Sequence, residues 1–285
     1  KNDWRVNGHL NISRNINEVT ELPINMQQEV YTLNNGNYAI LVEEGRPLGS
    51  FYGYRYKGVY KDTDATYARD AEGNVMNDVN GKPIVMKNHT AQVCPGDAIY
   101  EDINYDGVIN EYDIVYLGNY MPIITGGAGI TVKYKRCSLT SLFHYRLGQK
   151  IINSARMNNE SMYGPRNQST ATLRRWKNEG DVTDIPRALF SEGYNYLGSD
   201  RFVEDASYLR LKSLSFNYAI PKKFCTQIGI NSLSVFVTAE NLFTWTDYTG
   251  QDPEVSIPNK ATSLAMDGAT TPISKKFSCG FNLSF

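Results

Sequence analysis

One segment of the chain has the residue spacing of a calcium-binding loop. Residues 102–113 read Asp-Ile-Asn-Tyr-Asp-Gly-Val-Ile-Asn-Glu-Tyr-Asp, so oxygen-bearing side chains occupy alternate positions at its start and a glycine follows them. Carboxylate, amide and backbone carbonyl oxygens are the ligands that Ca²⁺ takes, and the glycine permits the sharp turn that brings them together. The candidate ligands are Asp102, Asn104, Asp106, the backbone carbonyl of Val108, and Asp113.

The last ligand distinguishes this loop from that of an EF-hand. An EF-hand has glutamate at this position, whereas the shorter side chain of Asp113 is less able to hold an ion with both oxygens. The flanking sequence also lacks long helices, so the loop resembles the dockerin variety of the motif. A turn rich in Asp and Asn that holds no metal is the alternative. A calcium ion here would stabilise an external loop and would not be catalytic.

No other residue pattern indicates an enzyme. His9 and His144 have no carboxylate or serine at a catalytic spacing. The glycines of residues 126–129 open a strand pattern without the helix and Lys-Ser/Thr pair of a phosphate loop, so we expect them to serve packing. The four cysteines are far apart with no CxxC pair, which argues against zinc and favours unpaired thiols. We predict that the chain is not an enzyme.

Composition limits the possible partners of the protein. Basic residues number 29 and acidic residues 30, so the net charge of −1 creates no field that would attract nucleic acid. Mean hydropathy is −0.43, and no apolar run approaches the ~20 residues of a membrane-spanning helix. The strands of a transmembrane barrel alternate in polarity and are compatible with both values. The 20 tyrosines suit membrane-interface girdles and sugar-binding loops.

The end of the sequence has the period of a strand with one apolar face. In residues 275–285 apolar side chains alternate with small or polar ones, and the last residue is aromatic. A strand between lipid and a water-filled lumen has this pattern. The apolar positions are Phe277, Cys279, Phe281, Leu283 and Phe285.

Similar segments elsewhere predict an all-β chain, an antiparallel transmembrane barrel segment in which short turns alternate with long loops. Polar stretches at about 61–120, 148–206 and 244–274 are too long for hairpins, and we expect them to be external loops. A shift of the apolar register within residues 207–219 predicts a β-bulge or a tilt of the strand at the membrane edge. The seven predicted strands are 3–14, 50–60, 126–135, 137–147, 207–219, 231–243 and 275–285.

Seven strands cannot close a bacterial barrel, because these barrels use even numbers from eight upward. We therefore expect residues 1–285 to be the C-terminal portion of a longer protein, whose N-terminal part supplies the signal peptide and an odd number of further strands. A soluble calcium-binding β-sandwich that acts as an adhesin is the alternative. Its strands would alternate in the same way, but its loops are usually shorter.

Four blocks of sequence resemble, in order, the closing third of SusC/RagA-type TonB-dependent outer-membrane transporters. The last residues also resemble the C-terminal signal that the barrel assembly machinery reads, at Ser278, Gly280, Leu283 and Phe285. The four blocks are residues 45–54 (GRPLGSFYGY), residues 96–110 (GDAIYEDINYDGVIN) with residues 117–122 (LGNYMP), residues 206–212 (ASYLRLK) and residues 239–254 (AENLFTWTDYTGQDPE).

This resemblance implies a 22-stranded barrel with an N-terminal plug, of which the chain would form strands sixteen to twenty-two. The family imports oligosaccharides or peptides with energy passed through the TonB complex, and a SusD-like surface lipoprotein covers the barrel and shares the ligand. The protein would lie among the lipids of the outer membrane of a Gram-negative bacterium, with its C-terminus on the periplasmic side. A barrel fragment that serves mainly to dock the lipoprotein is the alternative.

Aromatic residues of the predicted external loops are candidate ligand contacts, because aromatic rings stack on sugar rings. The alternative is that they pack loop against loop or contact the lipoprotein. The candidates are Tyr163, Trp176, Tyr194, Tyr196 and Trp245.

Overall fold

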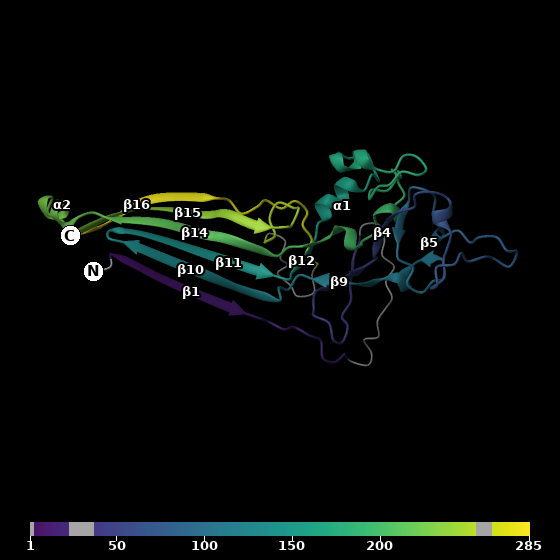
Figure 1. Ribbon diagram of the computed structural model, residues 1–285, viewed down its shortest axis with the longest axis horizontal. Helices are drawn as coiled ribbons and strands as arrows, with labels where there is room; N and C mark the ends of the chain where they lie inside the picture. The colour runs from purple at the N-terminus through teal and green to yellow at the C-terminus, as the bar shows by residue number, and fades with distance from the viewer. Residues whose placement is uncertain (1–2, 23–36, 255–263) are drawn as a thin grey trace.

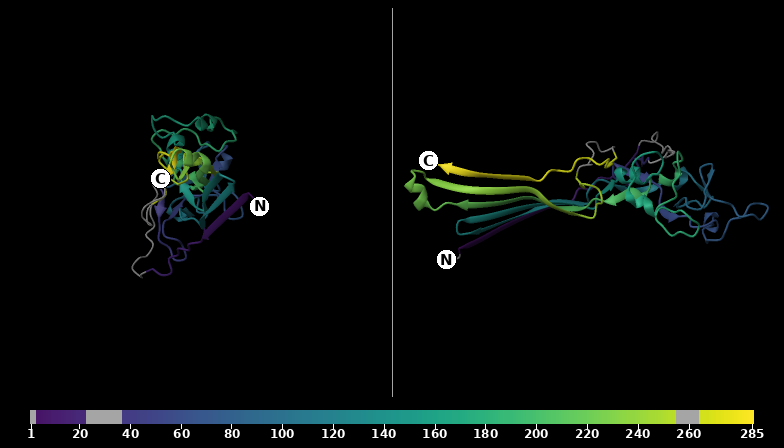
Figure 2. Two further views of the ribbon diagram at one scale, coloured as in Figure 1. Left: turned by 90° about the vertical axis from the view of Figure 1, so that its left-hand side faces the viewer. Right: turned by 90° about the horizontal axis from the view of Figure 1, so that it is seen from above.

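The computed structural model describes residues 3–22, 37–254 and 264–285, and consists of one large sheet with a folded loop domain at one end (Figure 1). The sheet, called the wall below, is antiparallel with the strand order β1-β10-β11-β14-β15-β16. Both described ends of the chain lie at the end of the wall away from the loop domain (Figure 2). The wall strands are β1 (Trp4–Ser13), β10 (Ile124–Tyr134), β11 (Cys137–Leu147), β14 (Tyr208–Ala219), β15 (Ser232–Thr246) and β16 (Lys276–Ser284).

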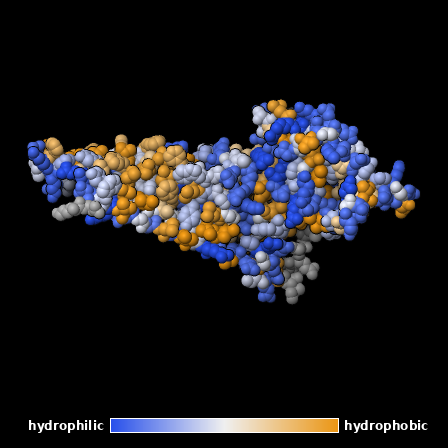
Figure 3. Space-filling view, viewed as in Figure 1, coloured by the Kyte–Doolittle hydropathy of each residue, from blue (hydrophilic) through white to orange (hydrophobic). Residues whose placement is uncertain are grey.

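The wall has one apolar and one polar face, because side chains alternate along each strand and the register keeps like residues in rows. No second sheet covers the apolar face in the part of the chain that the structure describes, and Phe216 and Phe277 are 44% and 72% exposed. Figure 3 shows apolar residues gathered along the wall and polar residues over the loop domain. One apolar row is Val6, Val132, Leu139, Phe216, Val237 and Cys279, and the neighbouring polar row is Asn7, Thr131, Thr140, Ser215, Thr238 and Ser278.

This single layer argues against the β-sandwich. A sandwich would bury the apolar face beneath a second sheet, whereas the buried clusters found among the described residues lie in the loop domain. The all-β fold class predicted from the sequence is confirmed. No helix among the described residues is long and apolar enough to cross a membrane.

The predicted bulge is confirmed, and it lies at Lys212. The pairing of β14 shifts register there against both neighbouring strands, so that Leu211 and Ser213 have partners while Lys212 has none. The extra residue restores Leu209 and Leu214 to the same face of the wall, although their spacing in the sequence is odd.

The predicted wall strand at residues 50–60 is wrong. Its two halves, β3 (Ser50–Gly53) and β4 (Tyr56–Val59), pair with β9 (Val115–Asn119) and β7 (Ala98–Tyr100) inside the loop domain. All four residues of β3 are buried, as in a strand that is covered on both faces. The β1 strand therefore pairs directly with β10, and the described wall has six strands instead of seven. Its first and last strands run in opposite directions, so an even number of further strands would close it.

The loop domain comprises the described parts of residues 14–123, 148–207 and 247–275. Backbone hydrogen bonds join these three parts. The N–H of Tyr54 donates to the carbonyl of Gly198, and the N–H of Ile152 donates to that of Ala265, each at 2.9 Å. Its largest core is rich in tyrosine and includes Tyr52, Tyr54, Tyr60 and Tyr100. Its other elements are β2 (Ala39–Ile40), β5 (Lys87–Asn88), β6 (Ala91–Gln92), β8 (Val108–Ile109), β12 (Lys150–Ile152), β13 (Val203–Asp205), helix α1 (Ser154–Glu160), and the 3₁₀ helices Asp64–Thr66, Glu111–Asp113, Thr170–Arg174, Tyr194–Tyr196 and Asp200–Phe202; helix α2 (Lys222–Gln227) lies in the turn between β14 and β15.

Candidate functional site

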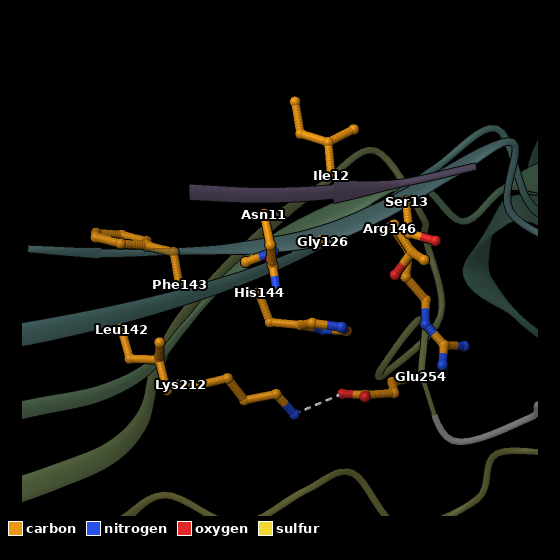
Figure 4. A pocket seen from close by; sticks show the side chains of 12 residues that line it. Asn11, Ile12, Ser13, Gly126, Leu142, Phe143, His144, Arg146, Lys212 and Glu254 are labelled. Carbon is orange, nitrogen blue, oxygen red and sulfur yellow. Dashed lines mark hydrogen bonds and ion pairs between the residues drawn. The ribbon is translucent and has the colours of Figure 1, made fainter. Parts of the chain in front are cut away.

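The polar face of the wall carries a pocket where it meets the loop domain. This inner pocket has a volume of about 580 Å³ and lies over β1, β10, β11 and the bulge of β14. Figure 4 shows His144, Arg146, Lys212 and Glu254 on one side of the strands, whereas Ile12 points to the other. The polar residues that line the pocket are Asn11, Ser13, Thr125, His144, Arg146, Lys212 and Glu254.

Beside this pocket, four charged residues tie the third part of the loop domain to the wall. The guanidinium of Arg210, which is 1% exposed, contacts Oδ1 of Asp252 at 2.5 Å and Oε2 of Glu254 at 2.9 Å. It also donates to Oγ1 of Thr244 at 2.9 Å. The bulge turns Lys212 toward the same carboxylate, and its Nζ lies 3.0 Å from Oε2 of Glu254. We call Arg210, Lys212, Asp252 and Glu254 the clamp.

Opposing effects act on Glu254 of the clamp. Burial disfavours its charged form, but the hydrogen bond and charge of Lys212 and the charge of Arg210 outweigh burial and hold the pKa of Glu254 below its usual range. Glu254 is therefore ionised at neutral pH. Two sequence blocks that lie far apart in the chain, residues 206–212 and 239–254, thus meet through their charges.

The glycines of residues 126–129 serve packing, as predicted. A Cβ atom on Gly126 would meet the ring of Tyr145, whose hydroxyl donates to the carbonyl of Asn11 at 2.9 Å. A Cβ atom on Gly129 would meet the imidazole of His9. Large side chains of the neighbouring strands therefore lie flat over the glycines and close the wall.

The first three candidate calcium ligands lie together in the loop domain. The carboxylate of Asp102 accepts from the backbone N–H of Gly107 at 2.8 Å, and Asp106 accepts from that of Val108 at 2.8 Å. The amide of Asn104 donates to Oδ2 of Asp106 at 2.9 Å. The glycine has φ of 81°, as the sharp turn requires. These oxygens have the chemistry of a hard-cation site and fit that part of the predicted set.

Asp113, the last candidate ligand, is engaged by the backbone. It is fully buried, and its two oxygens accept from the N–H groups of Ile103 at 2.7 Å and Asn110 at 2.8 Å. Burial raises the pKa of this carboxyl, and the charges of Asp102 and Asp106 add to the effect. No three His, Cys, Asp or Glu side chains in the described ranges gather closely enough to hold a metal ion. Calcium stays a prediction.

Two of the five candidate aromatic residues meet in a second, outer pocket. The rings of Tyr163 and Tyr196 lie 5.6 Å apart at 59° and line a space of about 310 Å³. Asn158, Asn167 and Gln168 line the same space and can both donate and accept hydrogen bonds. Planar rings beside amide side chains suit a polar ligand with hydroxyl or peptide groups.

The other three candidates have different surroundings. The ring of Trp176 lies against Gly96, and its Nε1 donates to the carbonyl of Lys61 at 3.3 Å. The hydroxyl of Tyr194 accepts from Arg187 at 3.3 Å. Trp245 lies on β15 rather than in a loop, on the apolar face of the wall beside Phe143 and Phe243. Trp245 is therefore part of an aromatic belt of the wall.

Neither the clamp residues nor Arg146 belong to a motif or spacing that would identify them from the sequence as site residues. Alternation does, however, place Arg210 between two leucines and thus on the polar face, which is a usable signal. Its partner Asp252 lies beyond the end of the next strand, and strand periodicity carries no information about that contact.

No family model matches the chain, but curated proteins and solved structures are similar to it. TonB-dependent receptor P3 of Formosa agariphila is 28% identical over 290 residues, which cover 96% of this chain and 26% of that protein. TonB-dependent receptor P26 of the same organism is 29% identical over 227 residues, which cover 79% of this chain and 21% of that protein. The chain thus spans about a quarter of the length of these relatives.

Solved structures agree with these relatives. A structure of the RagAB peptide transporter matches all of this chain with a TM-score of 0.68 and 26% identity, and this chain covers 28% of the matched one. The RagAB peptide importer in its 'open-open' state matches with a TM-score of 0.65 and 25% identity, with 27% of that chain covered. The chain is therefore similar in sequence to TonB-dependent receptors over as much as 96% of its length, and it shares the fold of the matching part of the RagAB structures.

Proposed function

We propose that the chain forms the C-terminal portion of an outer-membrane barrel that imports oligosaccharides or peptides together with a SusD-like surface lipoprotein, energised through TonB. The observation that carries this proposal is the single-layer wall with one apolar face. Such a sheet is stable only where lipid covers that face and water or protein covers the other. The similarity to TonB-dependent receptors and to a peptide transporter supports transport as the function of this barrel.

Closure of the barrel would involve both edges of the wall. Neither β1 nor β16 has a partner on its outer side among the described residues, and an open edge in a membrane leaves backbone groups unpaired. Further strands of the same receptor would complete the barrel, and the plug would lie inside it. In this arrangement the loop domain faces outward and the end of β16, with the candidate assembly signal from Ser278 to Phe285, lies on the periplasmic side.

The outer pocket supplies candidate contacts for the imported molecule. Tyr163 is 38% exposed and therefore open to contact, whereas Trp176 and Tyr194 already have partners in the loop domain. We propose the rings of Tyr163 and Tyr196 as its aromatic surface. The similar solved structures are those of a peptide transporter and a peptide importer. This similarity favours peptides over oligosaccharides as the substrate of this receptor.

The test uses the complete receptor in its own bacterium. Deleting the receptor should abolish uptake of the small molecules that co-purify with it, as identified by mass spectrometry, and depletion of TonB should have the same effect. Pull-down from solubilised membranes should recover a surface lipoprotein. If the receptor recovers the lipoprotein but the deletion strain takes up these molecules normally, the result would instead support a barrel fragment that serves mainly to dock the lipoprotein. Finding neither glycan nor peptide among the co-purified molecules would contradict nutrient import.

A further inference from the structure

We propose that the inner pocket binds a carboxylate group of the imported molecule through Arg146. This inference rests on the proposed transport function and names the chemical class of substrate that the pocket selects. Arg146 lines the pocket on the polar face of β11, and its guanidinium points away from the strands into that space (Figure 4).

The charges around the pocket do not balance. Arg146, Arg210 and Lys212 are cationic, whereas Asp252 and Glu254 are the anionic groups, and both carboxylates already contact the clamp cations. Arg146 makes no ion pair with any residue that the structure describes, and its Nε is buried without a hydrogen-bond partner. One positive charge is therefore left without a partner in a partly enclosed space, and an anion there would remove the imbalance.

The shape of the site favours a carboxylate over a bulkier anion. A planar guanidinium matches the two oxygens of a carboxylate, and the side chain can turn to present Nε together with a terminal nitrogen. Asn11, Ser13 and Thr125 surround the pocket with neutral polar groups that can bond to the rest of a polar ligand. Glu254 lies on the same pocket and would repel a second negative charge. A ligand group with a single carboxylate therefore suits the pocket best.

The position of the pocket favours a passing molecule as the source of that carboxylate. The pocket is at the end of the wall where the strands meet the loop domain, on the face opposite the apolar rows. In the proposed orientation this is the outer mouth of the barrel lumen, through which an imported molecule must pass. A peptide C-terminus, an acidic side chain and an acidic sugar all provide the required group.

The experiment compares ligands that co-purify with three forms of the complete receptor, purified with its lipoprotein from the native membrane. Mass spectrometry should find ligands with carboxylate groups on the wild type. We expect Arg146→Gln to reduce them at least tenfold per receptor, because a hydrogen bond to a charged group is lost. Arg5→Gln is the matched control, since Arg5 is exposed on the same face at the far end of the wall and should retain the ligands.

A second measurement needs no variant and so does not depend on folding. Methyl esterification of the recovered ligands should weaken rebinding to the wild-type receptor at least tenfold. Mass spectrometry distinguishes peptide from sugar acids. Ligands without carboxylates, or equal binding of acid and ester, would overturn the inference. So would an Arg146→Gln receptor that keeps its ligands but unfolds at lower temperature, because the carboxylate would then belong to the receptor itself.

Failure of this inference can be told apart from failure of the transport function. If the receptor takes up neutral molecules in a TonB-dependent way, the proposed transport function would stand and only the carboxylate selectivity would be contradicted. Equal uptake by the wild-type and deletion strains would contradict the proposed transport function.

Discussion

Replacing Arg210 with methionine tests the clamp most directly. The guanidinium is 1% exposed and holds Asp252, whose side chain is 6% exposed, at 2.5 Å. Arg210→Met keeps an apolar stem but leaves Asp252 as a buried charge without its cation. Breaking one partner of a buried ion pair destabilises by about 3–5 kcal/mol. Glu254 keeps its contact with Lys212, so the loss should concentrate on the Asp252 side of the clamp.

Hydrogen exchange measured by mass spectrometry on the purified receptor reports this loss locally. An opening free energy reduced by about 3–5 kcal/mol accelerates exchange roughly 150- to 5,000-fold in the segment concerned. We expect this acceleration in peptides that cover residues 247–254 and 264–274, with little change in β10 or β11. Adding Asp252→Asn should recover much of the loss, because no uncompensated charge then remains.

The control is the same substitution at an exposed ion pair. Arg174 lies 4.0 Å from Asp184 with both side chains about two-thirds exposed, at 69% and 68%. Exposed pairs contribute about 0–1 kcal/mol, so Arg174→Met should change exchange by less than about fivefold. Unchanged exchange in residues 247–254 of Arg210→Met would refute the clamp as the attachment of this segment. A similar acceleration in both variants would refute the role of burial.

The remaining predictions concern Glu254 of the clamp, the loop at residues 102–113 and the outer pocket. The folded-state pKa of Glu254 is lowered, so its carboxylate stabilises the clamp fully above the unfolded-state pKa and loses this effect as the pH falls through the folded-state pKa. Exchange in residues 247–254, corrected for its intrinsic pH dependence, should then rise, and Glu254→Gln should abolish that rise. If the loop at 102–113 binds calcium, adding Ca²⁺ at about 100 times its dissociation constant should stabilise the loop by about 2.7 kcal/mol against proteolysis, whereas Asp106→Ala should show no calcium effect. Tyr163→Ala should weaken ligand binding about threefold to tenfold in titration calorimetry, whereas Tyr112→Ala, at a tyrosine that is 66% exposed away from the outer pocket, should leave it unchanged.

Strand periodicity predicted most of the wall because apolar and polar side chains alternate along its strands and the register lines them up on opposite faces. The odd spacing of apolar residues in this strand also indicated a bulge or a tilt, and the structure has a bulge at Lys212. The segment at residues 50–60 failed for a related reason. The glycines and tyrosines of this segment indicate a strand but not its partner, and β3 pairs with β9 inside the loop domain.

The candidate site was less predictable because its contacts join distant parts of the chain. Tyr163 and Tyr196 were identified from residue type alone, and their meeting in one pocket depends on how the second part of the loop domain folds back. Trp245 has the same residue type but continues β15 past the predicted strand end, which places it on the apolar face. Arg146 is distinguished by a buried Nε that has no hydrogen-bond partner among the described residues, which a linear sequence does not reveal.

Because β1 pairs directly with β10, the loop-domain segment between these two strands can change in sequence and length independently of the wall. Ser13 and Thr125 are partners in register, so residues 14–123 leave and rejoin the wall at adjacent points. An insertion anchored in this way can grow, shrink or be exchanged without moving any wall strand. Replacing it with a tight hairpin would change the loop-closure entropy by only ~3 kcal/mol, because that entropy grows with the logarithm of length. A different external surface can therefore be inserted at this one hairpin while the register of β1 on β10 stays unchanged.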